Sequence, residues 1–150
     1  MSGKLLLKNR RATYEYEIFK KFEAGIVLIG AEVKSLRAGS GSFFGSYVKL
    51  LSGEAYLLNA QITPYKFADN HDYDPKRTRK LLLHKKELAE IEELSTQKGR
   101  ALIPLAFVLK DRNIKLEFAV ARGKKQHDKR QDLKKKAQAR DTAREMKGRW

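Results

Sequence analysis

Cysteine is absent from the 150-residue sequence. This absence excludes a disulfide framework, a thiolate zinc site and a thiol nucleophile, and it is typical of a reducing compartment. No stretch approaches the roughly 20 apolar residues of a membrane span. The apolar residues 5–7 are far too few for the core of a signal peptide. We therefore expect a cytoplasmic protein without a membrane partner.

Residues that carry catalysis are also scarce. The three histidines, His71, His84 and His127, are scattered and none pairs with another at metal-ligand spacing. The glycines at Gly39 and Gly41 lack the further glycines of a dinucleotide site and the Lys-Ser/Thr pair of a phosphate-binding loop. We therefore expect no catalytic residue, no metal and no cofactor.

Positive charge is abundant by contrast. The chain has 33 Lys and Arg against 18 Asp and Glu, a formal net charge of +15. Nucleic acid is the default partner of such a surface, because each Lys or Arg that meets a phosphate releases a counterion. A membrane surface ranks second, but the sequence offers no lipophilic anchor. The composition predicts an RNA-binding or DNA-binding protein.

The charge divides the chain near Gly123. Residues 122–150 carry twelve Lys or Arg and four Asp or Glu, so a fifth of the chain holds about half of the net charge. This part has few large apolar residues and cannot bury enough surface to offset its ordering. We therefore divide the chain into a folded domain, residues 1–122, and a basic C-terminal tail, residues 123–150.

The spacing of small and apolar residues in the tail predicts a helix. Ala139, Ala143, Met146 and Trp150 recur at helical spacing on one narrow stripe. A coiled coil would need Leu or Ile in place of the two alanines. We expect the tail to be disordered in isolation and to become helical when it lies along RNA.

The first 122 residues have mostly β patterns. Tyr14, Tyr16 and Ile18 alternate with acids, as in a half-buried strand, and residues 26–29 predict a strand buried on both faces. Residues 47–51 and 54–59 flank Ser52 and Gly53, which predicts a hairpin. Residues 101–109 and 114–121 predict a second hairpin across residues 111–113.

Two helical segments interrupt the strands. Apolar residues between positions 83 and 94 have helical spacing and end before Gly99, and a shorter helical turn covers residues 33–38 before Gly39. Many short strands with few helices suit an OB-like closed barrel of about six strands with two or three helices. The predicted fold class is therefore mostly β.

One basic stretch is the best candidate for RNA contact. Residues 75–86 contain no acid, and their cations surround Leu81, Leu82 and Leu83. In a strand here, alternate leucines would be buried, the guanidinium groups would point outward, and an exposed Leu could pack on an unstacked base. The alternative is an ordinary solvated edge strand protected by charge. From this stretch we select Arg77, Arg79 and Lys80.

Two other features allow RNA contact. Asn9, Arg10 and Arg11 form a smaller basic cluster, for which a mobile terminus is an equally good interpretation. Phe43, Phe44 and Tyr47 could stack on bases, but core packing is favoured for at least two of them.

The sequence resembles one known family over nearly its whole length. The blocks that carry the resemblance, in order, are residues 9–12 (NRRA), 22–25 (FEAG), 32–39 (EVKSLRAG), 46–47 (SY), 62–65 (ITPY), 74–75 (DP), 77–83 (RTRKLLL) and 123–130 (GKKQHDKR). They are similar to those of small protein B, the SsrA-binding proteins. Eight blocks in the same order make the resemblance highly specific.

The resemblance implies a function and a set of partners. Family members grip the tRNA-like domain of transfer-messenger RNA with an OB-like barrel and deliver it to stalled ribosomes for trans-translation, which rescues the ribosome and tags the nascent peptide. The implied partners are this RNA and the small-subunit decoding centre, with elongation factor Tu and alanyl-tRNA synthetase reached through the shared RNA.

The resemblance also implies site residues. RNA contacts are expected at Asn9, Glu23, Leu82, His84 and Lys115, to which the basic clusters add Arg11, Arg77, Arg79 and Lys80. The segment expected in the decoding centre contains Gly123, Lys124, Lys125, His127, Asp128, Lys129 and Arg130, and Met146 matches a position linked to helix formation in the empty mRNA channel.

Some positions depart from the family pattern. Tyr14 stands where His or a polar residue is expected, Gly45 where an acid often occurs, Glu145 where an apolar residue occurs, and His84 where an amide is common. An acid such as Glu23 is unfavourable beside phosphate but can accept hydrogen bonds from base amino groups. We therefore expect Glu23 to specify and the lysines to position the RNA.

Two other functions remain open. A ribosomal or assembly protein could bind ribosomal RNA permanently through the same basic faces. An RNA-modifying enzyme ranks third, since the sequence shows no site for a small cofactor.

Overall fold

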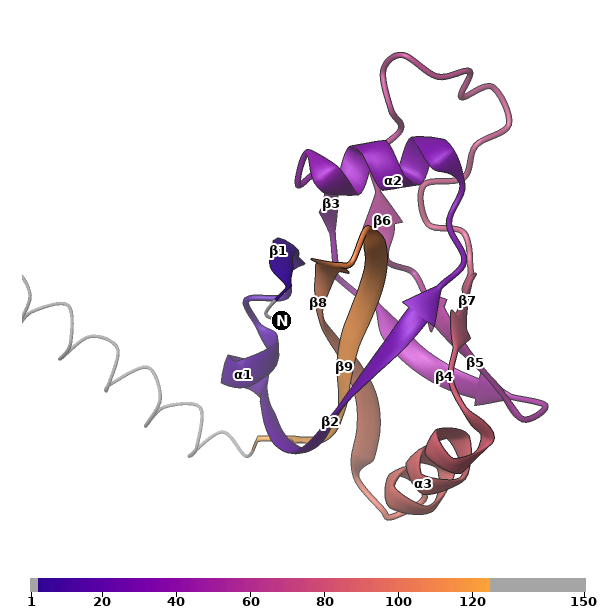
Figure 1. Cartoon of the computed structure of the whole chain (residues 1–150). Helices are drawn as coiled ribbons and strands as arrows, with labels where there is room; N and C mark the ends of the chain where they lie inside the picture. Colours follow the sequence, from indigo (N-terminus) through magenta and orange to yellow (C-terminus); the bar gives the residue numbers. More distant parts are fainter. Residues whose placement is uncertain (1–2, 125–150) are drawn as a thin grey trace, which may run out of the picture.

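A closed β-barrel forms the body of the protein (Figure 1). The computed structural model describes residues 3–124. Six strands close the ring in the order β8 (Arg100–Lys110), β4 (Tyr47–Leu51), β5 (Glu54–Leu58), β7 (Arg79–Leu82), β2 (Tyr16–Ile26) and β9 (Asn113–Gly123), which pairs again with β8. The predicted OB-like barrel of about six strands is confirmed.

Smaller elements attach to this ring. Strand β1 (Lys4–Lys8) pairs with residues 106–109 of β8, whereas β4 pairs with β8 at Leu102. A separate pair joins β3 (Gly41–Ser42) to β6 (Gln61–Ile62). Three helices complete the described part: α1 (Ala12–Glu15), α2 (Gly30–Arg37) and α3 (Lys85–Ser95). None of the helices in residues 3–124 is long and apolar enough to cross a membrane.

Both predicted hairpins are confirmed. Ser52 and Gly53 join β4 to β5 with φ of 50° and 77°, and Asp111 and Arg112 join β8 to β9 with φ of 47° and 69°. Two consecutive residues with positive φ give a turn whose twist matches that of the strands. The second loop has two residues rather than three, because Asn113 already pairs with Lys110.

The strand predicted around Tyr14 begins later than expected. Tyr14 lies in α1, and β2 starts only at Tyr16. The helical turn buries Ala12 against a cluster on the outside of the barrel that includes Ile103 and Ala121. This burial favours a turn where the alternation of residue types alone favours a strand.

The strand predicted for residues 26–29 is wrong. Strand β2 ends at Ile26, and Val27 and Ile29 are each 48% exposed. The chain leaves the barrel here because the Ile29 backbone N–H donates to the Glu32 carboxylate at 3.0 Å, which starts α2 at Gly30. Helix α2 therefore begins three residues before the predicted helical turn.

Aromatic and branched side chains fill the barrel. Phe22 stacks on Phe118 with 5.7 Å between ring centroids, and Phe43 stacks on Phe107 at 4.9 Å. Phe43 is buried, but Phe44 is 74% and Tyr47 is 39% exposed. The expectation that at least two of Phe43, Phe44 and Tyr47 belong to the core is therefore wrong.

Candidate nucleic-acid interface

An open groove crosses the outer surface where β2, β7 and β9 meet. It consists of two adjoining cavities of about 330 and 230 Å³ that share Gly25, Leu82 and Lys115. The first cavity is also lined by Glu23, His84 and Glu87, and the second by Arg112. Four residues predicted as RNA contacts, Glu23, Leu82, His84 and Lys115, therefore lie together.

Strand register brings the groove residues to one face. Gly25 on β2 is paired with Leu82 on β7 and with Lys115 on β9, and cross-strand partners point to the same side of a sheet. Leu82 is 54% exposed, as expected for one of the three leucines. A Cβ atom on Gly25 would lie 3.3 Å from the Leu82 Cβ, so glycine keeps the floor of the groove open.

The polar ends of the groove differ in charge. Glu23 forms an ion pair with Lys110, and this hydrogen bond raises the pKa of Lys110. Glu87 accepts a hydrogen bond from the His84 backbone N–H at 3.2 Å, which fixes the start of α3. Lys115 lines both cavities, whereas Arg112 lines only the second one. The groove thus offers the carboxylates of Glu23 and Glu87 at one end, Leu82 and Lys115 where the two cavities meet, and the Arg112 cation at the other end.

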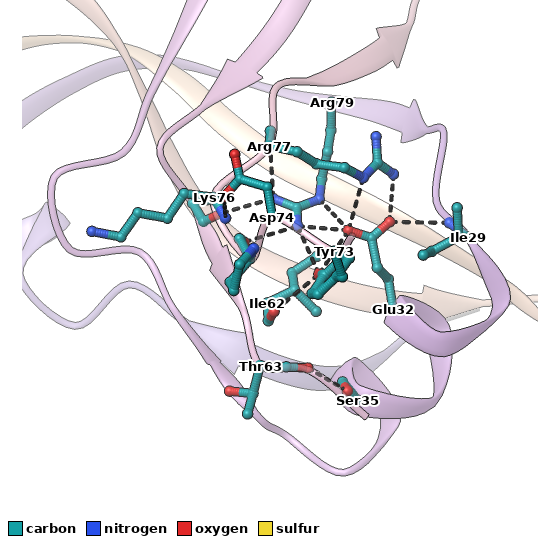
Figure 2. Close-up of polar contacts among 12 residues, drawn as sticks. Ile29, Glu32, Ser35, Ile62, Thr63, Tyr73, Asp74, Lys76, Arg77 and Arg79 are labelled. Carbon is teal, nitrogen blue, oxygen red and sulfur yellow. Dashed lines mark hydrogen bonds and ion pairs between the residues drawn. The ribbon is translucent and has the colours of Figure 1, made fainter. Parts of the chain in front are cut away.

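Arg79 takes no part in this groove. Its side chain is fully buried, and its guanidinium forms an ion pair with the Glu32 carboxylate (Figure 2). Arg79 Nε donates to Glu32 Oε2 at 2.7 Å, and Nη1 and Nη2 donate to the carbonyl oxygens of Ala60 and Pro75 at 2.7 and 3.0 Å. The prediction that this guanidinium points outward to RNA is wrong, because its counter-ion lies on α2, outside the acid-free stretch.

The same carboxylate holds two further residues. Arg77 forms an ion pair with Glu32 and keeps a side chain that is 30% exposed, and the Tyr73 hydroxyl lies 3.0 Å from Glu32 Oε2. Burial acts to raise the pKa of Glu32, but hydrogen bonds from Arg77, Ile29 and Arg79 outweigh it and lower the pKa. This cluster joins α2 to β7 and to the loop before it. The Arg77 side chain therefore stabilises the fold through its ion pair with Glu32.

The remaining predicted contacts lie apart from the groove. Lys80 points to solvent 4.0 Å from Glu54. Asn9 donates to the Pro104 carbonyl oxygen at 2.8 Å, and Arg11 lies over the ring of Phe44. Asn9 and Arg11 line a separate cavity of about 160 Å³.

Only the first two residues of the predicted tail segment are described. Gly123 ends β9, and the Lys124 backbone N–H donates to the Glu15 carbonyl oxygen at 2.9 Å. The other predicted tail residues lie outside the described residues: Lys125, His127, Asp128, Lys129, Arg130 and Met146. Glu145, which departs from the family pattern, and the predicted helical stripe that ends at Trp150 also lie outside the described residues.

Sequence reasoning missed Gly25 and Arg112 as groove residues and Lys110 as the ion-pair partner of Glu23. The predicted second hairpin placed Arg112 in a loop, but nothing local shows that β9 pairs with β2 along its length. Within residues 3–124, no group of three or more His, Asp or Glu is placed to hold a metal ion.

Comparisons with known proteins identify the family of this chain. The profile of the SmpB protein family matches residues 6–148. An SsrA-binding protein of Staphylococcus saprophyticus is 48% identical over 145 residues, which cover 97% of this chain and 94% of that protein. Another, from Geotalea uraniireducens, is 46% identical over 149 residues, 99% of each chain. The chain belongs to the SmpB protein family.

A solved structure agrees with the SmpB assignment. A chain from the study "tmRNA-SmpB: a journey to the center of the bacterial ribosome" superposes with a TM-score of 0.68 at 44% identity. The match covers 84% of this chain and 92% of that one. The SmpB resemblance seen in the sequence is therefore confirmed, as is the barrel fold.

Proposed function

We propose that this protein binds the tRNA-like domain of transfer-messenger RNA through the groove and delivers the RNA to stalled ribosomes for trans-translation. The observation that carries the proposal is the meeting of Glu23, Leu82, His84 and Lys115 around Gly25. Membership of the SmpB family, relatives named SsrA-binding proteins, and a structural neighbour described with tmRNA and the bacterial ribosome support it. The protein acts by binding and not by catalysis.

Each groove residue has a separate part in the proposed binding. The exposed Leu82 side chain packs on a base that is turned out of its stack. Lys115 and Arg112 contact phosphates, which positions the RNA without reading its sequence. The Glu23 carboxylate exchanges Lys110 for a base amino group, and the exposed His84 ring lies at the same end of the groove.

The rest of the chain completes the proposed function. Asn9, Arg11 and Lys80 make further contacts around the barrel, and residues 123–130 enter the decoding centre. Met146 lies in the part of the tail that becomes helical in the empty mRNA channel. Elongation factor Tu and alanyl-tRNA synthetase are reached through the RNA rather than through the protein.

Two groove variants test the proposal by different readouts. Lys115→Ala removes a phosphate contact, so the affinity for the isolated tRNA-like domain falls about tenfold and the slope of log affinity against log salt falls by about one. Leu82→Ala removes about 1.5–3 kcal/mol of apolar burial but no charge, so the affinity falls while the salt slope stays constant. Binding is measured by fluorescence anisotropy with labelled RNA.

Lys49→Ala is the matched control. Lys49 is an exposed lysine on β4 that lines neither cavity of the groove, so its loss changes the affinity little. If Lys115→Ala and Leu82→Ala both bind the RNA as the wild type does, the groove is not the RNA site. If the protein purified from its cells carries ribosomal RNA but no transfer-messenger RNA, a permanent ribosomal role replaces the proposed one.

A further inference from the structure

Phe19 is presented to solvent by an irregularity in β2. The pairing of β2 with β9 shifts between Ile18 and Lys20, so Phe19 has no partner residue on β9. Such bulges turn a side chain away from its regular direction. The ring is 42% exposed although Phe is among the most apolar residues.

Two guanidinium groups lie against this one ring. Arg100 Cζ is 4.3 Å and Arg122 Cζ is 5.9 Å from the centroid of Phe19. Cations are attracted to the negative face of an aromatic ring, and the guanidinium plane stacks on it. Arg100 Nη1 also donates to the Leu94 carbonyl oxygen at 3.1 Å, so this guanidinium is held by a hydrogen bond as well as by the ring.

The charges of this site are not balanced within the described residues. Arg100 on β8 is the cross-strand partner of Arg122 on β9, and Arg122 is the partner of Glu17 on β2, with which it pairs at 2.6 Å. Like charges directly opposite each other destabilise a sheet. Glu17 forms its ion pair with Arg122, and Arg100 has no carboxylate within ion-pair distance among the described residues, which leaves its positive charge unpaired.

We propose that Arg100 and Arg122, stacked on Phe19, bind a phosphodiester of an RNA backbone at a site separate from the groove; this inference rests on the proposed RNA-binding function. Guanidinium forks match the geometry of phosphate oxygens and make charge-assisted hydrogen bonds to them. Because the ring holds both forks in advance, little side-chain freedom is lost on binding. An anion between them also relieves the repulsion of the arginine pair.

The position of the site makes it a second contact. Phe19 lies six residues before Gly25 on β2, about 20 Å away at roughly 3.3 Å per residue, so it lies away from the groove along the strand. Arg122 directly precedes Gly123, from which the chain runs into residues 125–150 with ten Lys or Arg and four Asp or Glu. The bound phosphate therefore belongs to a different part of transfer-messenger RNA from that in the groove, or to ribosomal RNA.

The double variant Arg100→Gln with Arg122→Gln tests the site in the full-length protein. Affinity is measured over a series of salt concentrations for the whole transfer-messenger RNA and for small ribosomal subunits. We expect a slope of log affinity against log salt that is lower by about one to two, and affinity at low salt reduced about tenfold, for the RNA that supplies the phosphate. Unchanged slopes with both RNAs would overturn the proposal.

The control variant removes the same charge elsewhere. Lys49→Gln with Lys66→Gln changes two lysines that do not touch Phe19, Arg100 or Arg122. If this control lowers the salt slope as much as the arginine variant does, the effect is one of general charge and the site does not exist. Thermal unfolding of each variant is measured in parallel, since Arg122 and Arg100 also contact Glu17 and α3.

A second variant keeps all charges. Phe19→Leu leaves an apolar side chain but removes the ring face that orders both arginines, so the affinity falls about threefold while the salt slope is unchanged. Wild-type affinity would refute the role assigned to the ring. Lys115→Ala separates this inference from the proposed function. If Lys115→Ala binds the RNA normally and the arginine variant binds it weakly, the groove is refuted as the RNA site. If Lys115→Ala binds the RNA weakly and the arginine variant binds it normally, only the Arg100–Arg122 site is refuted.

Discussion

At the scale of single residues, one buried carboxylate joins helix α2 to strand β7 and to the loop before it. Glu32 accepts hydrogen bonds from the Ile29 backbone, Arg77 and Arg79, and all its side chain is buried (Figure 2). Removal of one partner of a buried ion pair leaves the other charge without compensation. Arg79 has no second carboxylate among the described residues, although it has carbonyl oxygens.

The first prediction concerns Glu32→Gln. We expect the variant to lose about 3–5 kcal/mol of unfolding free energy at neutral pH, because Arg79 stays buried with its charge unpaired. Urea denaturation followed by circular dichroism measures this loss. Glu54→Gln, which removes an exposed acid that lies 4.0 Å from Lys80, should change the stability by less than about 1 kcal/mol.

The pH dependence of stability gives a second test of Glu32. Its pKa in the folded protein is below the ordinary value of 4.5, so the unfolded chain binds more protons between these two values. The contribution of Glu32 to stability is therefore complete above pH 4.5 and is lost as the pH falls through the folded-state pKa. The unfolding free energy of Glu32→Gln should therefore fall less than that of the wild type as the pH drops below 4.5. If the two curves of unfolding free energy against pH run parallel below pH 4.5, this role of Glu32 is refuted.

At the scale of elements, the β8–β9 hairpin combines a strained turn with a place in the groove. Asp111 and Arg112 both have positive φ, which Asp tolerates better than Arg does. Arg112 nevertheless occupies the position that lines the cationic cavity with Lys115. The turn thus keeps a residue that its backbone conformation disfavours.

The third prediction is that stability and RNA binding respond in opposite directions to Arg112→Gly. Relief of the left-handed strain of about 1–2 kcal/mol exceeds the added entropy cost of glycine, so the variant is more stable by about 0.5–1 kcal/mol. It loses one phosphate contact, so its salt slope for RNA falls by about one. Asp111→Gly is the control, with a smaller gain in stability and unchanged binding. Lower stability of Arg112→Gly would contradict the strain argument.

At the scale of the whole molecule, turn residues predicted both hairpins, whereas contacts between residues distant in the sequence could not be predicted. The two hairpins could be predicted because their turn residues lie between the strands they join. The pairing of β2 with β9 joins residues about 100 positions apart, and the burial of Arg79 depends on Glu32, 47 positions earlier. The family resemblance named Glu23, Leu82, His84 and Lys115 from the sequence. The place of Gly25 and Arg112 in the groove depends on how the strands of the barrel pair, which the sequence alone does not show.

The fourth prediction separates the barrel from the tail. Truncation after Lys124 keeps two hydrogen bonds at the end of β9, from Lys124 N–H to the Glu15 carbonyl oxygen and from Lys124 Nζ to the Thr13 carbonyl oxygen, each 2.9 Å long. The barrel therefore folds as in the full chain, and the groove is intact. We expect affinity for the tRNA-like domain within about tenfold of the wild type, or about 1.4 kcal/mol.

The same truncated protein should fail on the ribosome. It lacks residues 125–150 and their net charge of +6, ten Lys or Arg against four Asp or Glu, so peptide tagging in a reconstituted translation reaction on truncated mRNA is lost. Full-length Lys115→Ala provides the opposite pattern, with weak RNA binding and tagging that recovers when the RNA is supplied in excess. Tagging by the truncated protein would remove the tail from the mechanism, whereas loss of RNA affinity far beyond tenfold would mean that the tail, and not the groove, holds the RNA.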